Sequence, residues 1–438
     1  MNKILHILIV TMILPITIYG QGFFPLDTLD HDQVSSLTSF YESRFDKILQ
    51  EIDMNDKKQK KIIVNFYKEQ KEFFLDQIEE KSFIHDKEIT EYFHSILKDI
   101  LVANSINEGE YKILLSAKDE INAYNLGEGS IVVHFGLLDY LSSEDQLASV
   151  ICHEIGHQIL EHVKTGIYQH ARLVTSDEVN KEAKKISDSN YNKSKDAMNF
   201  IRKLSYNNYR NRRKREIEAD SIGFLLYTKT GRKKQEYLST LKVLDESDLE
   251  KDTLTMEIIR NTFNFESAPF KDKWLKTEDN SIFNYDNKNN YNYNLHVDSL
   301  KSHPSCLERI KILEEIFKDD FTSIENIDLN NSPSFTKWKE NSELQTIYNL
   351  YSIEDYGRCL YKSIIYYNKY NNHKNDVKNL IAESLLRLKE AKTEYRINNY
   401  IPNIHPTENS ASLNLFINFI HNLRTSEMEQ LSKNILLN

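Results

Sequence analysis

The spacing of apolar residues predicts a mostly helical chain that contains one small group of strands. Over residues 34–107 apolar side chains recur at helical intervals, as at Tyr92, Ile96 and Ile100. Residues 111–117 and 131–134 are instead rich in β-branched side chains, which favours strands. We therefore expect an α+β fold, with the preceding helices as the scaffold beneath a small sheet.

A strong helical pattern begins after Ser143. Ser143 and Gln146 have the spacing of a capping box, in which each side chain pairs with a free backbone amide of the first turn. Apolar residues then follow at every fourth position and predict a buried stripe. They are Leu147, Ile151, Ile155 and Ile159. On such a helix, His153 and His157 lie one turn apart on the other side.

His153 and His157, with Glu154 next to the first of them, form an H-E-x-x-H pattern. Two neutral imidazoles one turn apart can bind the same ion, and the carboxylate can act as a general base toward water that the ion activates. The alternative is an ordinary helix with two surface histidines. A third ligand elsewhere in the chain decides between the two interpretations.

Glu216 is the best candidate for that third ligand. It lies in a segment, residues 206–227, that has helical spacing, and Asp220 follows it by one turn. Glu216 would complete a His2Glu site with one open position, as in catalytic zinc sites, and Asp220 could accept the second N–H of a ligand histidine. Taken alone, such a pair of acids is also common on solvated helix faces.

Further motifs surround this pattern in sequence. They are Ile121-Asn122-Ala123-Tyr124, Gly129-Ser130-Ile131-Val132-Val133 and Gly136-Leu137-Leu138 upstream, and Ser302-His303-Pro304-Ser305 with Arg309 and Ile310 downstream. Over residues 90–315 the order resembles that of the gluzincin metallopeptidases related to HtpX, BepA, the Oma-type proteases and the CAAX prenyl endopeptidases, which make up the forty-eighth metallopeptidase family.

The resemblance implies a gluzincin catalytic domain with a small sheet, an active-site helix and one zinc ion per chain. His153, His157 and Glu216 would be the zinc ligands. Glu154 would be the general base, and Asp220 would orient a ligand histidine.

The resemblance also implies a place for the substrate. An extended peptide would pair through main-chain hydrogen bonds with the edge of the sheet, which residues 131–133 would form. The substrate-binding residues would be Asn122, Ala123, Ile131, Val132 and Val133. His303 would lie near the metal and bind substrate or stabilise the oxyanion. The alternative is that it only stands before Pro304 at the entry to a helix that Ser305 caps.

Two features depart from the family pattern. Tyr124 stands where phenylalanine is usual, which keeps an aromatic ring and adds a hydroxyl. Residues 164–203 form a long polar stretch between His157 and Glu216, rich in Lys, Ser, Asp and Asn. Its composition favours a surface excursion over a lid.

The composition is that of a globular protein and argues against nucleic acid as the main partner. The chain has 438 residues, 40% of them hydrophobic, and a formal net charge of −10. One basic run, Arg210–Arg215, is expected to be a solvated helix flank. The alternative is that it attracts an acidic substrate or lipid headgroups, in a peripheral contact with a membrane.

The N-terminus has the pattern of a secretory signal. Lys3 supplies a positive charge, residues 4–18 are almost wholly apolar, and Gly20 offers a small residue for cleavage. The apolar run is short for a membrane-spanning helix, and no cysteine follows it closely to carry a lipid anchor. We therefore expect cleavage near Gly20 and a periplasmic or secreted protein.

Three cysteines do not make a disulfide framework. Cys152 precedes the first proposed ligand and Cys306 follows the Ser302–Ser305 motif, so both would lie near the site. We expect small, buried, unpaired side chains, while a bridge between Cys152 and Cys306 is the alternative in an oxidising compartment.

These landmarks divide the chain into four parts: a signal peptide (1–20), an N-terminal helical segment (21–88), a peptidase domain (89–320) and a helical C-terminal region (321–438). Residues 284–294 are rich in Asn and Tyr and are expected to form a loop. Residues 356–369 and 376–391 have the spacing of a helical hairpin that faintly resembles a tetratricopeptide repeat. A plain helical extension is the alternative, because one such unit cannot bury its faces alone.

Together these features predict a zinc-dependent endopeptidase that hydrolyses extracytoplasmic proteins. By analogy with the resembling family, its substrates would be unfolded or misassembled envelope polypeptides, in a role in protein quality control. The alternative is a metal-binding chaperone or assembly factor whose protease site is latent. Against this alternative, each catalytic group is present, whereas a decayed site usually loses the glutamate or a ligand.

Overall fold

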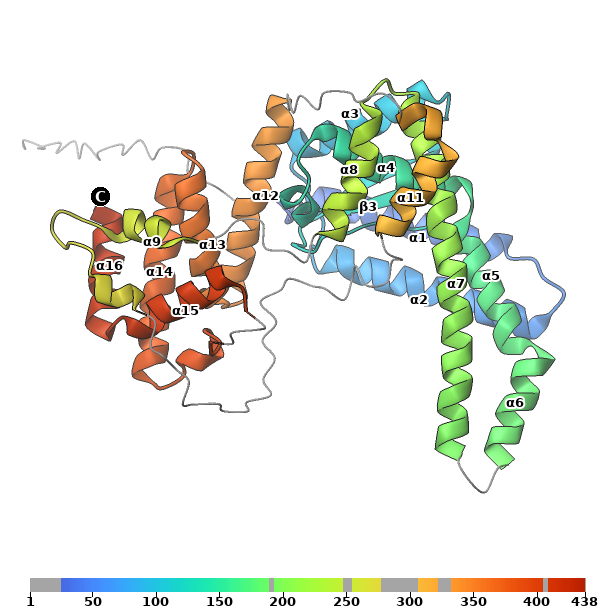
Figure 1. Ribbon diagram of the computed structural model, residues 1–438. Helices are drawn as coiled ribbons and strands as arrows, with labels where there is room; N and C mark the ends of the chain where they lie inside the picture. Colours follow the sequence, from blue (N-terminus) through green and yellow to red (C-terminus); the bar gives the residue numbers. More distant parts are fainter. Residues whose placement is uncertain are drawn as a thin grey trace, which may run out of the picture.

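The structure, a computed structural model, describes residues 25–188, 193–246, 254–276, 306–321, 332–404 and 409–437, with backbone alone for 193–210. Figure 1 shows a body of helices and strands on one side, a helical body on the other, and α12 between them. The predicted signal peptide, the Asn/Tyr-rich stretch 284–294 and His303 lie outside the described residues.

The mixed body contains α1 (His31–Glu51), α2 (Lys57–Glu79), α3 (Lys87–Ala103), η1 (Glu108–Glu110), β1 (Lys112–Ser116), β2 (Ala123–Asn125), β3 (Ser130–His134), η2 (Phe135–Asp139), α4 (Glu144–Ile159), α5 (His162–Thr175), α6 (Asp177–Asp188), α7 (Lys193–Thr228), α8 (Lys234–Asp245), α11 (Cys306–Ile316) and η4 (Lys318–Phe321). The helical body contains α9 (Met256–Phe263), η3 (Asp272–Leu275), α13 (Tyr356–Lys369), α14 (Lys374–Thr393), η5 (Ile397–Asn399), α15 (Ala411–Asn422) and α16 (Thr425–Leu437), and α12 (Pro333–Ser352) joins the two.

Three strands of the described chain form one sheet, in the order β1-β3-β2. β1 runs parallel to β3, and β2 runs antiparallel to it. The turn between β2 and β3 contains Gly127 and Gly129, with φ angles of 85° and 100°. Glycine adopts this left-handed backbone at little cost, and a Cβ at Gly129 would overlap the carbonyl oxygen of Glu110. The turn therefore requires glycine.

Helices cover both faces of this sheet. Leu114 and Val132 point to the face that packs against α1 and α2. Ile113 and Ile131 point to the opposite face, where they share an apolar core with α3 and α4. Successive strand residues alternate between faces, so a sheet covered on both sides needs continuous apolar strands. The predicted strands and the helical scaffold before them are confirmed.

The prediction that residues 131–133 form the edge of the sheet is wrong. β3 pairs with β1 on one side and with β2 on the other, and all three residues are fully buried. The short strand β2, which contacts α4, lies at the edge instead. Apolar content marks a buried strand, but it does not tell which strands lie beside it.

α4 begins as the sequence predicts. The backbone N–H of Gln146 donates to Oγ of Ser143 at 3.2 Å, and the N–H of Ser142, rather than that of Ser143, donates to the Gln146 side chain at 2.6 Å. The first three positions of the predicted apolar stripe are fully buried. The fourth, Ile159, is 44% exposed, so the prediction is wrong there, because α4 leaves the core in its last turn.

The polar stretch 164–203 is helical where the structure describes it, apart from a break at Ser176. It falls within α5, α6 and the first part of α7, and in Figure 1 α6 and the start of α7 extend away from the body as an arm. α6 has no buried residue. Beside the arm, Arg212, Arg213 and Lys214 are exposed, and Arg213 pairs with Glu308 of α11. This exposure agrees with the predicted solvated flank.

α12 contributes to two separate apolar cores. Near its start, Phe335 and Trp338 pack in the core of the mixed body. Further along, Leu344 and Leu350 pack in the core of the helical body. Apolar side chains of the segment 254–276 belong to that second core too, although the segment lies within the range predicted for the peptidase domain. The chain thus enters the helical body twice.

The two helices predicted near the C-terminus are both present. α13 has the predicted bounds, and α14 includes the second predicted range. Their kinship with tetratricopeptide repeats stays a prediction. None of the helices described here has the length and apolar character that a membrane span requires.

Candidate metal centre

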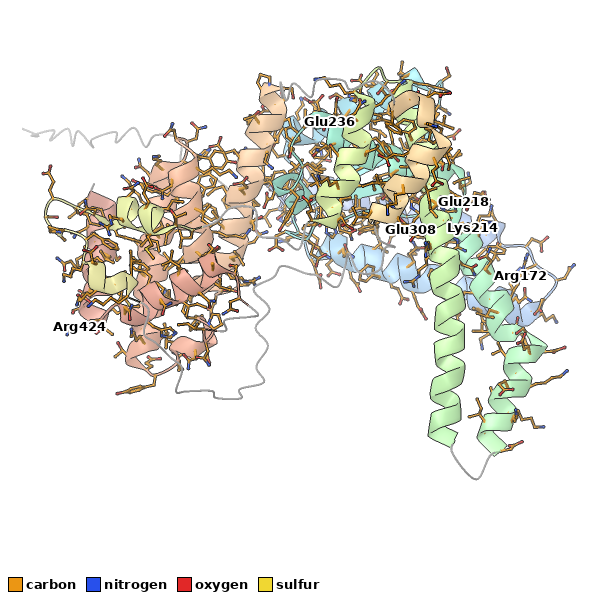
Figure 2. The ribbon with its side chains drawn as sticks, in the orientation of Figure 1. Arg172, Lys214, Glu218, Glu236, Glu308 and Arg424 are labelled. Carbon is orange, nitrogen blue, oxygen red and sulfur yellow. The ribbon has the colours of Figure 1, made fainter. Side chains whose placement is uncertain are left out.

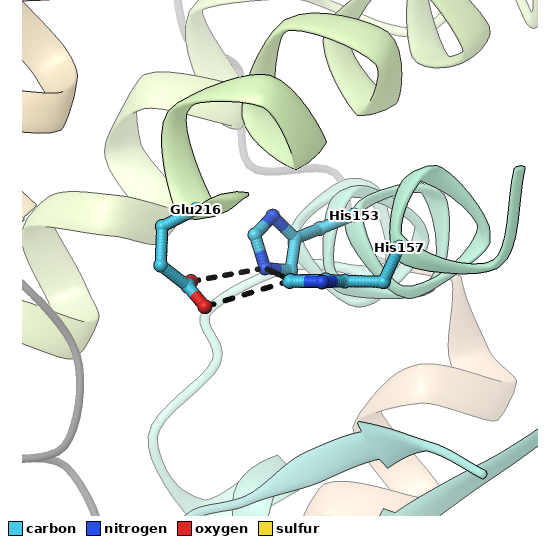
Figure 3. A group of neighbouring side chains, drawn as sticks. All are labelled: His153, His157 and Glu216. Atoms are coloured by element: carbon cyan, nitrogen blue, oxygen red, sulfur yellow. Dashed lines mark hydrogen bonds and ion pairs between the residues drawn. The ribbon is translucent and has the colours of Figure 1, made fainter. Parts of the chain in front are cut away.

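α4 and α7 bring three potential metal ligands together. His153 and His157 lie one turn apart on α4, and Glu216 reaches toward them from α7 (Figure 3). One ligand atom from each residue can be chosen so that all lie within 4.8 Å of one another. The three side chains are 13%, 15% and 10% exposed, so they are largely shielded from water.

The distances between these atoms suit one small ion. Nε2 of His153 lies 3.0 Å from Nε2 of His157, and the carboxylate oxygens of Glu216 lie 3.5 and 3.6 Å from the two nitrogens. A tetrahedral zinc ion with bonds of about 2.0–2.1 Å holds its ligand atoms roughly 3.3 Å apart. The donor set and the spacing therefore both fit such an ion.

The two imidazoles differ in their affinity for protons. Burial opposes protonation of His153, but hydrogen bonding to Asp220 and Glu216 outweighs it and raises the pKa of His153 to about 10. Burial and the neighbouring His153 lower the pKa of His157 to about 3. Two facing nitrogens 3.0 Å apart share either a proton or a cation, because their lone pairs alone would repel. A metal ion can take the place of that proton.

Two glycines allow α4 and α7 to approach closely enough for this arrangement. A Cβ at Gly156 would lie 2.7 Å from the carbonyl oxygen of Ala219 on α7. A Cβ at Gly223 would lie 2.9 Å from Cα of His153 on α4. Both distances are too short for carbon, so larger residues would force the helices apart. The helix crossing sets the distance between Glu216 and the two histidines.

A buried ion pair between Asp220 and Arg309 lies on the Nδ1 side of His153. Nδ1 of His153 lies 2.9 Å from Oδ1 of Asp220. Arg309 of α11 donates two hydrogen bonds of 2.6 Å to the same carboxylate. Although burial opposes ionisation of Asp220, Arg309 holds its pKa at about 2. Asp220 is therefore an anion that can accept the Nδ1–H of His153 and leave Nε2 free for a metal.

The sequence profile described as Peptidase family M48 matches residues 87–317, more than half of the chain. The chain belongs to peptidase family M48. Because M48 members are metal-dependent peptidases, the chain contains a metalloendopeptidase domain, and the His-His-Glu group lies within the residues that match the profile.

Individual relatives agree with the M48 assignment. The chain is 30% identical over 104 residues to the beta-barrel assembly-enhancing protease of Yersinia pestis, which is 23% of this chain and 21% of that protein. Against the protease of the same name from Escherichia coli K12, identity is 37% over 81 residues, 18% and 16% of the two chains. Against the mitochondrial metalloendopeptidase OMA1 of Arabidopsis thaliana it is 34% over 140 residues, 30% and 25%. The matches thus cover about a quarter or less of these relatives' own length.

The structure places the other residues predicted for the site in different positions. Glu154 lies on α4 beside His153 and is 7% exposed, and its role as general base stays a prediction. Ala123 is on the edge strand β2, and the carbonyl of Asn122 just before it accepts from the N–H of His134 at 3.0 Å. Residues 131–133 cannot pair with a peptide, because β1 and β2 already pair with their strand. His303 lies outside the described residues.

Two residues of the M48 centre had no role in the sequence prediction. Arg309 belongs to the downstream motif, but nothing in the sequence indicates that it pairs with Asp220. His162 follows His157 by five residues, a spacing that would put it on another side of a continuous helix. A turn after α4 brings it back, so its nitrogen Nδ1 lies 2.9 Å from Nδ1 of His157. The only signal for His162 in the sequence is that a histidine follows shortly after the H-E-x-x-H motif.

The cysteines are unpaired. Cys152 and Cys359 are buried and Cys306 is partly buried, and all three are free thiols. Burial raises the pKa of the Cys306 thiol and that of Cys152, which keeps both protonated at neutral pH. The alternative of a bridge between Cys152 and Cys306 is not what the structure shows.

Proposed function

We propose that the protein is a zinc-dependent endopeptidase with a gluzincin catalytic site. The observation that carries the proposal is the convergence of His153, His157 and Glu216 at distances suited to one zinc ion, with Glu154 buried beside them. The donor set leaves one coordination position for water or substrate, as a catalytic rather than a structural zinc site requires.

Glu154 is the residue to which we assign the proton transfers. A bound zinc ion would polarise the scissile carbonyl and make water acidic enough to be deprotonated near neutral pH. The carboxylate of Glu154 accepts the proton of the attacking water and delivers it to the departing amine. Asp220 and Arg309 hold His153 in one orientation during both transfers.

The edge strand β2 is the feature that supports a polypeptide substrate. β2 spans Ala123–Asn125, pairs with β3 on one side and contacts α4, which carries the two histidines. An extended peptide can add to such an edge through main-chain hydrogen bonds, which select backbone conformation more than sequence. Unfolded chains offer extended backbone, so we propose unfolded or misassembled polypeptides as the substrate class.

We further propose that these substrates are envelope proteins and that the enzyme acts in the periplasm or after secretion. Support comes from the apolar N-terminal run ahead of Gly20 and from the name of the bacterial relatives, beta-barrel assembly-enhancing protease. The proposed localisation is tested by the mass of the protein recovered from its native compartment. Loss of about the first twenty residues is expected, and an intact N-terminus would contradict it.

The catalytic proposal is tested with the full chain, Zn2+ and unfolded casein. Glu154→Gln should bind zinc as the wild type does and lose about 10²–10⁴-fold in the rate of cleavage, since it removes only the general base. Glu216→Ala should lose zinc affinity together with activity. Glu91→Gln, which changes an exposed carboxylate on α3, is the control and should leave both properties unchanged.

Two results would contradict this function. If the wild type binds no zinc, or if Glu216→Ala binds it equally well, the metal centre is wrongly assigned. If zinc is bound but Glu154→Gln retains the full biological function in cells, the alternative of a metal-binding chaperone or assembly factor is favoured, because binding of clients does not require the general base.

A further inference from the structure

His162 contacts the ligand His157 on the side that faces away from the metal centre. Nδ1 of His162 lies 2.9 Å from Nδ1 of His157, while Nε2 of His157 faces His153 and Glu216. The side chain of His162 is 7% exposed. Water therefore has little access to the gap between the two rings.

The turn after α4 is built to make this contact. α4 ends at Ile159, and Glu161 adopts a left-handed backbone with φ of 48°, after which α5 begins at His162. A left-handed residue other than glycine costs about 1–2 kcal/mol. The turn folds α5 back across the end of α4, so that a histidine five positions beyond His157 meets it again.

The contact between Nδ1 of His157 and Nδ1 of His162 requires one donor and one acceptor. For Nε2 of His157 to offer its lone pair to a metal, the ring must carry its proton on Nδ1. That N–H points at Nδ1 of His162, which must then be an unprotonated acceptor. The single proton of a neutral His162 is therefore on Nε2, and Nε2 lies 3.4 Å from a carboxylate oxygen of Glu218.

We propose that His162 is a positioning residue for metal binding: it accepts the Nδ1–H of His157, fixes that ligand's tautomer and ring orientation, and is itself oriented by Glu218. The inference rests on the proposed metal-dependent function, because it concerns one of its ligands. Glu218 is on α7, like the ligand Glu216, and also pairs with Lys214 at 3.5 Å (Figure 2). Glu218 is 42% exposed, so water can replace much of its effect.

The two ligand histidines are thus oriented by different chemistry. Nδ1 of His153 lies beside a buried carboxylate, that of Asp220, which is 1% exposed and paired with Arg309. His157 donates to a neutral imidazole. Orienting partners of ligand histidines contribute about 10–100-fold to metal affinity. We expect His162 to contribute within that range and Glu218 to contribute less.

The test compares two substitutions of His162 in the full chain. His162→Asn places a carbonyl oxygen close to the position of Nδ1 and keeps an acceptor for His157. His162→Phe keeps the ring volume and removes the acceptor. His170→Phe is the matched control, because His170 lies on the same helix, α5, and is exposed.

Zinc affinity is measured by competition with a chromophoric chelator, and the fold is checked by circular dichroism and urea unfolding of the metal-free proteins. His162→Phe should weaken zinc binding by about 10–100-fold, while His162→Asn should stay within about threefold of the wild type. His170→Phe should match the wild type. A residue that merely fills space would give the reverse order, since phenylalanine is the better replacement for a ring.

Cobalt substitution gives a second readout that a space-filling role would not change. In the Co2+ protein, the ring N–H of each ligand histidine gives a strongly shifted proton resonance, visible only if solvent exchange is slow. Two such resonances are expected in the wild type and in His162→Asn, and one in His162→Phe.

The failure of this inference differs from the failure of the proposed function. If the wild type binds neither Zn2+ nor Co2+, the proposed function fails and the inference falls with it. If the wild type binds zinc, and His162→Phe binds it equally well with both resonances present, the positioning role of His162 is overturned alone. Equal loss of affinity in His162→Asn and His162→Phe would also overturn it.

Discussion

The charge balance of the metal centre depends on one buried carboxylate, that of Asp220. Its oxygens accept from Arg309 and contact His153, and Arg309 also approaches Glu216 at 3.5 Å. Arg309 is 5% exposed and Asp220 1%. A charge so far from water is stable only with its partner, because desolvation costs several kcal/mol per ion. The pair therefore stabilises the fold and also contacts the proposed ligand His153.

Replacing Arg309 with Met should leave Asp220 buried without its guanidinium partner, with only the imidazole of His153 beside it. We expect the free energy of unfolding to fall by about 3–5 kcal/mol, since removing one partner of a buried ion pair is strongly destabilising. Urea unfolding of the metal-free protein measures the effect. The double variant Asp220→Asn/Arg309→Met is the control and should recover part of the loss, because it removes both charges. A single variant as stable as the wild type would contradict the prediction.

At the scale of elements, the crossing of α4 and α7 decides whether a site exists at all. The two histidines and the glutamate are on different helices, and their spacing follows from how closely the backbones approach. Gly156 on α4 and Gly223 on α7 each face backbone atoms of the other helix at less than ordinary contact distance for a Cβ. The glycines therefore act on the metal centre without contacting a metal.

Gly223→Ala should weaken zinc binding although the residue is no ligand. The added Cβ meets Cα and N of His153 at 2.9 and 3.0 Å, so α7 must move away from α4 and carry Glu216 with it. We expect a loss of about 1–3 kcal/mol in stability from overpacking and roughly tenfold in zinc affinity.

Gly109→Ala is the matched control for this change. Gly109 lies in η1, and a Cβ there would meet only the side chain of Asn107 at 3.5 Å, an ordinary contact. It should leave both zinc affinity and stability close to the wild type. Chelator competition measures the zinc affinity of the two variants, and urea unfolding measures their stability. Equal zinc affinity in Gly223→Ala and the wild type would refute the role of the helix crossing.

At the scale of the whole molecule, α12 connects the peptidase body to the helical body. Its Ser342 donates to Oδ1 of Asp139 at 2.5 Å and its Thr346 to Oδ2 at 3.2 Å. Lys339 donates to the carbonyls of Leu138, Asp139 and Leu141 around the end of η2. These contacts between α12 and η2 form a joint between the two bodies. Because η2 follows β3 directly, the joint connects the helical body to the sheet under the metal centre.

The contribution of this joint to the free energy of unfolding should depend on pH through Asp139. Burial raises the pKa of Asp139 to about 6, although Lys362 and Lys339 favour the charged form. A carboxyl whose pKa is higher in the folded than in the unfolded chain stabilises the fold below about pH 4 and loses that contribution as pH rises through about 6. The loss should amount to about 1–3 kcal/mol.

Asp139→Asn removes this titration while it keeps an oxygen acceptor and a polar side chain. Urea unfolding of both proteins at pH 4, 5, 6 and 7 gives the difference in their free energies of unfolding. Titrating groups that do not interact with Asp139 cancel in this difference, which should shift in favour of the variant between pH 4 and pH 6. A difference that is constant with pH would show that Asp139 does not titrate there.

Local patterns in the sequence were enough to place several elements and to name three side chains that converge in the structure. The capping box at Ser143 placed the start of α4 correctly, and β-branched content placed β1 and β3. His153, His157 and Glu216 could be named because a helix has a fixed pitch and because their residue types bind metal. These are properties of short segments, so a short segment is enough to predict them.

The tertiary structure alone decided which segments meet. No local pattern distinguishes a middle strand from an edge strand, so β2 rather than residues 131–133 became the edge. Likewise the packing of residues 254–276 with the C-terminal helices, the pairing of Arg309 with Asp220 and the return of His162 to His157 join residues far apart in sequence or across a turn. Such contacts depend on how all elements share their apolar surface, and that balance is settled only when the whole chain packs.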